Sequence, residues 1–173
     1  MRKTTMTLAL VALPLFGAES VASPPPFAGG AIHVGVVVRD LAKSTAFYRD
    51  VLGMTKTGAF DVDATFAKAS GLTGGVPFHV DVFRLLDQPD AAQFKLMSFG
   101  KDTRTASSTH IQDAPGMRYF TLDVTDLTPF VARLKAAAIP FLGETPIPLD
   151  GANHFVLIQD PDGTFIELIG PMK

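Results

Sequence analysis

The chain contains one pattern twice, and this repeat restricts its fold more than any other feature. His33 and Tyr119 each lie in a short apolar run, and Asp40 and Asp126 each follow seven residues later. An apolar run of this length that ends just before a helix-capping residue is typical of a strand that leads into a helix. The sequence therefore predicts two copies of one strand–helix unit.

A helix is expected after each Asp, because an Asp side chain can accept hydrogen bonds from the first free backbone N–H groups of a helix. Gly53 ends the first helix, and Ile139-Pro140 ends the second. Thr128-Pro129 is an alternative start for the second helix. The apolar stripes are Leu41, Ser44, Phe47, Tyr48, Val51 and Leu52 in the first unit, and Leu127, Phe130, Val131, Leu134 and Ala138 in the second.

Each unit ends in a strand pair joined by a Pro- and Asp-containing turn: 76–86 with 93–99, and 154–159 with 165–169. The first unit is 14 residues longer, and an irregular loop around 60–75 is expected to hold the excess. The predicted fold class is α+β, with two β-α-β-β-β modules whose curved mixed sheets pair face to face around a central cleft.

The N-terminus is typical of a secretory signal peptide. Arg2 and Lys3 precede 12 apolar residues, and Ser20-Val21-Ala22 supplies small residues before a cut after Ala22. The apolar run is interrupted by Pro14 and is shorter than the ~20 residues of a membrane span. The expected organisation is signal peptide 1–22, linker 23–30, first module 31–100, connector 101–116 and second module 117–173. The mature protein is expected in the periplasm or outside the cell.

Composition excludes several function classes. The 15 basic and 17 acidic residues give a formal charge of −2, and signal removal leaves 13 and 16, a charge of −3. This balance argues against a nucleic-acid partner. The chain has no Cys, so disulfides, thiolate metal sites and Cys nucleophiles are excluded. We expect a small-molecule ligand or substrate, and no stable membrane insertion after signal cleavage.

The alternation of side chains along the strands selects candidate site residues. In the first strand Ile32, Val34, Val36 and Val38 are expected to pack under the helix, so that His33 faces the cleft. The same alternation and the repeat place Lys95, Tyr119 and Glu167 at equivalent positions. These four are the candidate catalytic residues. Lys95 and Glu167 are expected to form a buried ion pair, because an unpaired charge there is costly.

Further residues are candidates for substrate binding. His79 and Asp81 share one face of their strand, and that face is either inside the cleft beside Lys95 or on the solvent side. The direction of His154 is also open. The other candidate substrate-binding residues, all expected to line the cleft, are Met97, Phe99, Thr121 and Phe165.

Two segments resemble the vicinal oxygen chelate superfamily. They are Ile32-His33-Val34 with Asp40-Leu41 and the run from Ala46 to Met54, and then Asp160-Pro161-Asp162-Gly163-Thr164-Phe165-Ile166-Glu167-Leu168. The resemblance covers nearly all of 31–169. The superfamily includes glyoxalase I, methylmalonyl-CoA epimerase, extradiol dioxygenases, fosfomycin-resistance enzymes and bleomycin-binding proteins, so it implies a fold more narrowly than a reaction.

The resemblance also implies where a metal would bind. Metal-dependent members have ligands at the four inner positions, and this chain retains His33 and Glu167 there. Lys95 and Tyr119 replace two of the usual ligands, and catalytic metals usually take three protein ligands. A metal-free pocket is therefore favoured over a site for one divalent ion such as Zn, Mn, Ni or Fe. The resemblance further implies a homodimer, with the cleft either within one chain or shared between two.

Three functions remain. The first is a lyase or isomerase for a small carbonyl-bearing or aromatic compound, with His33 or Glu167 as base, Tyr119 as acid and Lys95 stabilising negative charge on oxygen. The second is a metal-free protein that sequesters a ligand, as in bleomycin resistance. The third is a metal-dependent lyase or dioxygenase that uses His33 and Glu167 as ligands. Export argues against glutathione and coenzyme A substrates, which are chiefly cytosolic.

Overall fold

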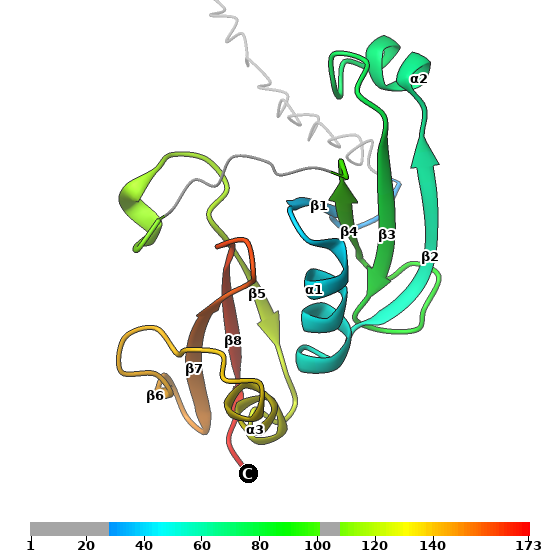
Figure 1. The fold of residues 1–173 in the computed structure, drawn as a ribbon. Coiled ribbons are helices and arrows are strands. Elements are labelled where there is room, and N and C mark those ends of the chain that lie inside the picture. Colours follow the sequence, from blue (N-terminus) through cyan, green and yellow to red (C-terminus); the bar gives the residue numbers. More distant parts are fainter. Residues whose placement is uncertain (1–27, 101–107) are drawn as a thin grey trace, which may run out of the picture. The chain divides into compact units, whose positions relative to one another are not determined.

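A computed structural model describes residues 28–100 and 108–173, and Figure 1 shows its fold. The expected signal peptide, residues 1–22, lies outside the described residues. Within the described part of the chain, no helix has the length and apolar character that crossing a membrane requires.

The first module forms a four-stranded sheet with the order β1-β4-β3-β2. Strands β1 and β4 are parallel, and the other neighbours are antiparallel. Helix α1 continues directly into the short π-helix η1. The elements are β1 (Val34–Val38), α1 (Leu41–Ala46), η1 (Phe47–Val51), β2 (Thr55–Val62), α2 (Ala64–Ala69), β3 (Phe78–Arg84) and β4 (Gln93–Ser98).

The second module repeats this plan with the order β5-β8-β7-β6, and β5 is again parallel to β8. The predicted α+β fold of two β-α-β-β-β modules is therefore confirmed, and the two sheets remain separate and open. A short 3-10 helix, η2 (Ile111–Asp113), lies in the connector. The other elements are β5 (Tyr119–Asp123), α3 (Thr128–Ala136), β6 (Ile147–Pro148), β7 (Asn153–Gln159) and β8 (Phe165–Pro171).

The helix boundaries follow local capping chemistry. The Asp40 carboxylate accepts a hydrogen bond from Lys43 N at 3.0 Å, as an N-cap does. Gly53 follows η1 with φ +77°, a conformation that favours glycine. In the second module, Asp126 accepts from Thr128 N at 3.0 Å and Pro129 occupies the first turn, so both expected start signals contribute to α3.

The excess length of the first module differs from the expected irregular loop. Strand β2 extends to Val62, and Asp63 then caps α2 by accepting from Phe66 N at 2.9 Å. Ala67 of α2 is fully buried in a small apolar cluster that includes Val62 and Phe78. A capping Asp and one small buried residue suffice for this short helix, whose weak apolar pattern gave no helical signal.

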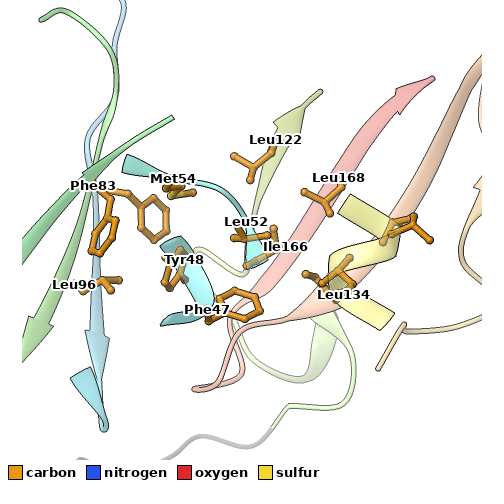
Figure 2. Packing of buried hydrophobic residues seen from close by; sticks show 14 of the residues in the cluster. Phe47, Tyr48, Leu52, Met54, Phe83, Leu96, Leu122, Leu134, Ile166 and Leu168 are labelled. Atoms are coloured by element: carbon orange, nitrogen blue, oxygen red, sulfur yellow. The ribbon is translucent and has the colours of Figure 1, made fainter. Parts of the chain in front are cut away.

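The main core joins the two modules through their helices. Buried residues of η1 and α3, with the partly buried Leu41 of α1, form one cluster with the residues on the helix-bearing sides of both sheets. The rings of Phe94 on β4 and Phe120 on β5 are 4.7 Å apart. Figure 2 shows Phe47, Tyr48 and Leu52 between the two sheets. The sheets thus share a core through the sides that carry the helices, whereas we expected them to pair through the opposite sides.

The turn between β7 and β8 fastens the second module to α1. The Tyr48 hydroxyl donates to Asp160 Oδ2 at 2.7 Å, and both residues are buried. Burial and the neighbouring Asp160 carboxylate raise the pKa of Tyr48 well above 10.0, so the hydroxyl keeps the proton that it donates. Asp162 accepts from Arg39 Nε at 3.0 Å and from Ser44 Oγ at 3.2 Å. We call Arg39, Ser44, Tyr48, Asp160 and Asp162 the clasp.

Removing the Tyr48 hydroxyl should destabilise the protein. Tyr48→Phe leaves one buried Asp160 oxygen without its donor, and the expected loss is about 1–3 kcal/mol of unfolding free energy. Chemical denaturation of Tyr48→Phe and of the matched control Tyr119→Phe, whose side chain is exposed, measures the difference. A Tyr48→Phe variant as stable as the control would contradict a structural role for the clasp.

Candidate functional site

The strand register defines one helix-free face on each sheet. Face A is the side of the first sheet opposite α1, with the rows Gly35–Lys95–Val82 and Val37–Met97–Val80 across β1, β4 and β3. Face B is the side of the second sheet opposite α3, with the rows Tyr119–Phe165–Gln159, Thr121–Glu167–Leu157 and Asp123–Ile169–Phe155 across β5, β8 and β7. Alternation therefore places the expected side chains away from the helices in both modules.

Lys95 lies at the centre of face A between small and apolar neighbours. Gly35 and Val82 flank it across the sheet. Gly35 has no side chain, and the Met97 thioether fills the space above it, since a Cβ at Gly35 would lie 3.2 Å from the Met97 methyl group. Among the described residues, no carboxylate forms an ion pair with its ammonium group. Its charge is thus available to a ligand or to another molecule.

His33 lies just before β1 at the edge of face A. Its Nδ1 accepts a hydrogen bond from Gln93 N at 2.9 Å. Because Nδ1 is the acceptor, the neutral ring carries its proton on Nε2. The side chain is exposed, so this Nε2–H can donate to a ligand.

Face B holds an oriented carboxylate. Thr121 Oγ1 donates to Glu167 Oε2 at 2.6 Å, which fixes the carboxylate and leaves its other oxygen open. Tyr119 lies one row away on the same strand as Thr121 and is 45% exposed. Phe165, its neighbour across the sheet, is buried, and the guanidinium of Arg118 lies 5.9 Å from the centre of its ring. Face B therefore presents a carboxylate, a phenol and a hydroxyl in adjacent rows.

The four candidate catalytic residues fall into two pairs. His33 and Lys95 belong to face A, whereas Tyr119 and Glu167 belong to face B. In the described part of the chain no ion pair joins Lys95 to Glu167, so that expectation was wrong. The physical reason is the shared core: it buries the helix-bearing sides of both sheets, and the two faces point away from it.

The two expected metal ligands are not brought together within the described residues of one chain. His33 and Glu167, the two expected ligands, lie in different modules on different faces. Within 28–100 and 108–173, no group of three or more His, Asp or Glu side chains is arranged to hold an ion. Two separated ligands are fewer than the three that a catalytic metal usually takes from a protein.

His79 and Asp81 lie on the opposite side of the sheet from Lys95. Asp81 is buried against α1, where Thr45 Oγ1 donates to its Oδ2 at 3.2 Å. Lys56 Nζ lies 2.7 Å from its other oxygen. The two residues therefore do not extend the polar patch around Lys95, and strand alternation alone could not decide this.

The expected apolar lining is divided in the same way. Met97 lies on face A, and Phe99 follows it in the direction of α2, where its ring is 5.2 Å from that of Phe78. Phe165 and Thr121 lie on face B with Glu167. Each face thus has its own apolar floor and its own polar groups.

Charge on the two faces is segregated, a feature that the sequence analysis missed. The charged strand residues of face A are Lys95 and Arg84, both basic, and those of face B are Asp123 and Glu167, both acidic. Arg118, just before β5, adds one basic group over Phe165 of face B. Arg84 lies one row beyond Val82, and its buried Nε has no hydrogen-bond partner. Strand alternation is the signal that could have identified Arg84, because this residue lies two positions after Val82 on the same strand and therefore points to the same side of the sheet.

Comparison with known families decides the assignment. The model of the Glyoxalase/Bleomycin resistance protein/Dioxygenase superfamily matches residues 30–168. The chain belongs to this superfamily. A search of curated proteins found no significant match.

Solved structures of the superfamily share the fold at low sequence identity. A glyoxalase family protein from Bacillus cereus has a TM-score of 0.67 and 18% identity, covering 87% of this chain and all of the other. The trypanothione-dependent glyoxalase I of Leishmania major has a TM-score of 0.58 and 19% identity, with 82% and 86% covered. The fosfomycin resistance protein of Listeria monocytogenes, solved with Mn(II) and sulfate, has a TM-score of 0.53 and 14% identity, with 84% and 95% covered.

The separation of Lys95 from Glu167 predicts that their contributions to folding are independent. In a double-mutant cycle of Lys95→Gln and Glu167→Gln, the two changes in unfolding free energy should add within about 0.5 kcal/mol. Denaturation at a protein concentration where the chain is monomeric measures them. An interaction energy well above that limit would show that the two side chains meet within one chain.

Proposed function

We propose that this chain is an exported enzyme of the lyase or isomerase type that acts on a small carbonyl-bearing or aromatic compound. The observation that carries the proposal is the Glu167 carboxylate, fixed by Thr121 at 2.6 Å on face B, with Tyr119 one row away. An oriented carboxylate beside an exposed phenol is the arrangement that paired base and acid catalysis needs.

The residues have separate roles in an isomerisation. Glu167 removes a proton from the carbon that lies between the substrate carbonyl and a carbon–carbon double bond. The electron pair of that C–H bond forms a new C=C bond, and the π electrons of the carbonyl move onto its oxygen. Lys95 stabilises the resulting negative charge by its positive charge. The electron pair on oxygen then re-forms the carbonyl while the far carbon of the original double bond takes a proton from Tyr119, and the phenolate regains a proton from Glu167. The substrate is thereby rearranged with no net gain or loss of protons.

The catalytic groups of face A and those of face B would meet in one cleft when two chains associate. The charged strand residues of face A are basic and those of face B are acidic, so these residues of one copy are electrostatically complementary to those of a second copy. Lys95 and His33 of one copy would then face Tyr119 and Glu167 of the other across a shared cleft. This arrangement supports a homodimer with two equivalent clefts.

Replacing the base should abolish turnover. Glu167→Gln keeps the shape and the hydrogen bond from Thr121 but cannot accept the substrate proton, so the rate should fall by about 10²–10⁴-fold. Turnover assays on a panel of small carbonyl and aromatic compounds measure it. Asp123→Asn, which removes the other acidic charge of face B, is the matched control and should keep most of the activity. Equal loss in both variants would assign the effect to charge and not to proton transfer.

Mixing two inactive variants tests whether the cleft is shared. A mixed dimer of Lys95→Gln and Glu167→Gln chains has one cleft with both native residues and one with neither. After unfolding and refolding together, the mixture should recover about a quarter of the native activity, since half of the dimers are mixed and half of their clefts are complete. Unmixed variants are the controls. No recovery would place the cleft within a single chain.

A sequestering protein is the second candidate, and the exposed apolar side chains of face A favour it. Val37 on β1 and Phe60 on β2 are 42% and 47% exposed on this face, where they could contact an aromatic ligand. In that case Glu167→Gln would lower ligand affinity only modestly, and no compound would be turned over. Elemental analysis of protein purified without chelator, with His33→Ala and Glu167→Gln alongside, tests the metal-dependent alternative.

Export is part of the proposal and has its own test. The mature protein should begin at Ser23, and intact mass and N-terminal sequencing of protein recovered from the periplasm or medium measure this. A change of Ala22 to a bulky residue should slow processing, because the cut requires a small side chain there. Protein retained in the cytoplasm with residues 1–22 intact would contradict export.

A further inference from the structure

A charged cluster on the α1 side of the first sheet ties its outermost strand to the rest. His79 on β3 lies between two carboxylates: its Nδ1 is 2.7 Å from Asp61 Oδ1, and its Nε2 is 3.0 Å from Asp81 Oδ1. Lys56 Nζ is 2.7 Å from the same Asp81 oxygen. We call Lys56, Asp61, His79 and Asp81 the β2 latch, because two of its members lie on β2 and two on β3.

The geometry requires a charged imidazole. Ionised carboxylates only accept hydrogen bonds, so both ring nitrogens of His79 must donate, and only the doubly protonated ring does so. The latch then contains two acids and two cations and is neutral. When His79 loses a proton, its neutral ring keeps one N–H and can donate to only one of the two carboxylates. A buried carboxylate loses more than an exposed one when it lacks a donor, so the remaining N–H stays on Asp81, and Asp61 loses the only hydrogen-bond partner that its side chain has among the described residues.

Asp81 is the fixed end of the latch. Its side chain is 3% exposed, whereas that of Asp61 is 84% exposed. Burial by itself would raise the pKa of Asp81, but the hydrogen bonds from Lys56 and His79 outweigh it and lower the pKa. Asp81 therefore stays ionised at neutral pH, and the group that titrates is His79.

The other elements around His79 bring no competing cation. Strand β4 places the uncharged Ser98 beside it, and α1 contributes Thr45 to Asp81. His79, Asp61 and Asp63 line one surface hollow of about 430 Å³. The Asp63 carboxylate in this hollow accepts a hydrogen bond from Phe66 N. On α1 and η1, Lys43 is exposed, and Arg49 and Asp50 pair with each other.

The latch controls the strand that leads to α2. Lys56 and Asp61 lie near the two ends of β2, an edge strand that is exposed along all but its last residue. Helix α2 follows at once, and its Ala67 packs with Val80 and Val82, the apolar floor of face A. The position of α2 over face A therefore depends on how firmly β2 is held.

We propose that the protonation state of His79 controls the β2 latch. Charged His79 fixes β2 and α2 over face A. Neutral His79 releases Asp61, and with it the end of β2 and the helix α2 that follows. The latch stands on its own geometry. Its effect on ligand access rests on the function proposed above, because face A is one wall of the proposed cleft.

The direction of the pH effect follows from linkage. Hydrogen bonds to Asp61 and Asp81 raise the pKa of His79 above its ordinary 6.5. A group whose pKa is raised by folding stabilises the closed state fully below the ordinary pKa and ceases to do so as the pH rises through the raised pKa. The opening equilibrium of β2–α2 should change about tenfold for each unit of that shift.

Hydrogen–deuterium exchange on the mature protein without ligand tests the latch. Peptides covering 55–69 should lose protection between pH 6 and pH 9, after correction for intrinsic exchange rates, while peptides of the second module stay unchanged. His79→Gln should exchange rapidly in this segment at both pH values, since an amide cannot serve two carboxylates with full charge. His154→Gln, a histidine change in the other module, is the matched control and should behave like the native protein.

A second variant keeps the test decisive should His79→Gln fold poorly. Asp61→Asn changes an exposed side chain and removes one of the two carboxylates. NMR titration should then show the His79 pKa shifted down relative to the native protein, with weaker protection of 55–69 at low pH. Equal protection of that segment at both pH values in the native protein, or the same pH-dependent loss in His79→Gln, would overturn the latch.

An apolar fluorescent dye, 1-anilinonaphthalene-8-sulfonate, tests access to face A. Dye binding should rise with pH in step with exchange of 55–69 in the native protein, and should be high and independent of pH in His79→Gln. Exchange without added dye binding would refute the control of access and leave the latch standing. This readout needs no turnover, so it does not depend on the identity of the substrate.

Discussion

The buried hydrogen bond between Tyr48 and Asp160 is the interaction on which the arrangement of this protein depends. The Asp160 carboxylate also accepts hydrogen bonds from the backbone N–H groups of Asp162 and Thr164 at 2.9 and 2.8 Å. One carboxylate therefore both stabilises its own turn and binds Tyr48 of the other module. A rigid turn is needed because Asp162 must reach Arg39 and Ser44 at the same time. The clasp thereby determines which sides of the two sheets are buried together.

That choice explains why each sheet offers a face to the outside. A β-sheet that packs against helices on one side has a second side that also needs cover. Here neither module covers the second side of the other module's sheet. Face A is partly covered by α2, the extra helix of the first module, whereas face B has no such helix. The repeated modules have therefore diverged most where they would meet a ligand or another copy of the chain.

The sequence predicted the modules well and their packing poorly, for physical reasons. Strand parity and capping residues are local, so the repeat, the helices α1 and α3 and the faces of Lys95 and Glu167 were correctly derived from spacing, whereas α2 was not. The choice between the two sides of each sheet depends on the partner of Tyr48, more than 100 residues away, which spacing does not encode. The sequence could not show which side of the sheet His79 and Asp81 face. That side is set by the contacts of Asp81 with Thr45 on α1 and Lys56 on β2, which only the structure shows.

The parallel pairing of first and last strands has a consequence for how the chain folds. Val34 pairs with Phe94, and Tyr119 pairs with Phe165, so each module closes only after a long loop has been brought together. The clasp turn lies in the last hairpin of the chain. Helix α1, although formed from early residues, thus completes its burial only when the C-terminal strands arrive. During synthesis the apolar side of α1 remains without its partner until the β7–β8 hairpin has been made, which favours an unfolded nascent chain up to that point.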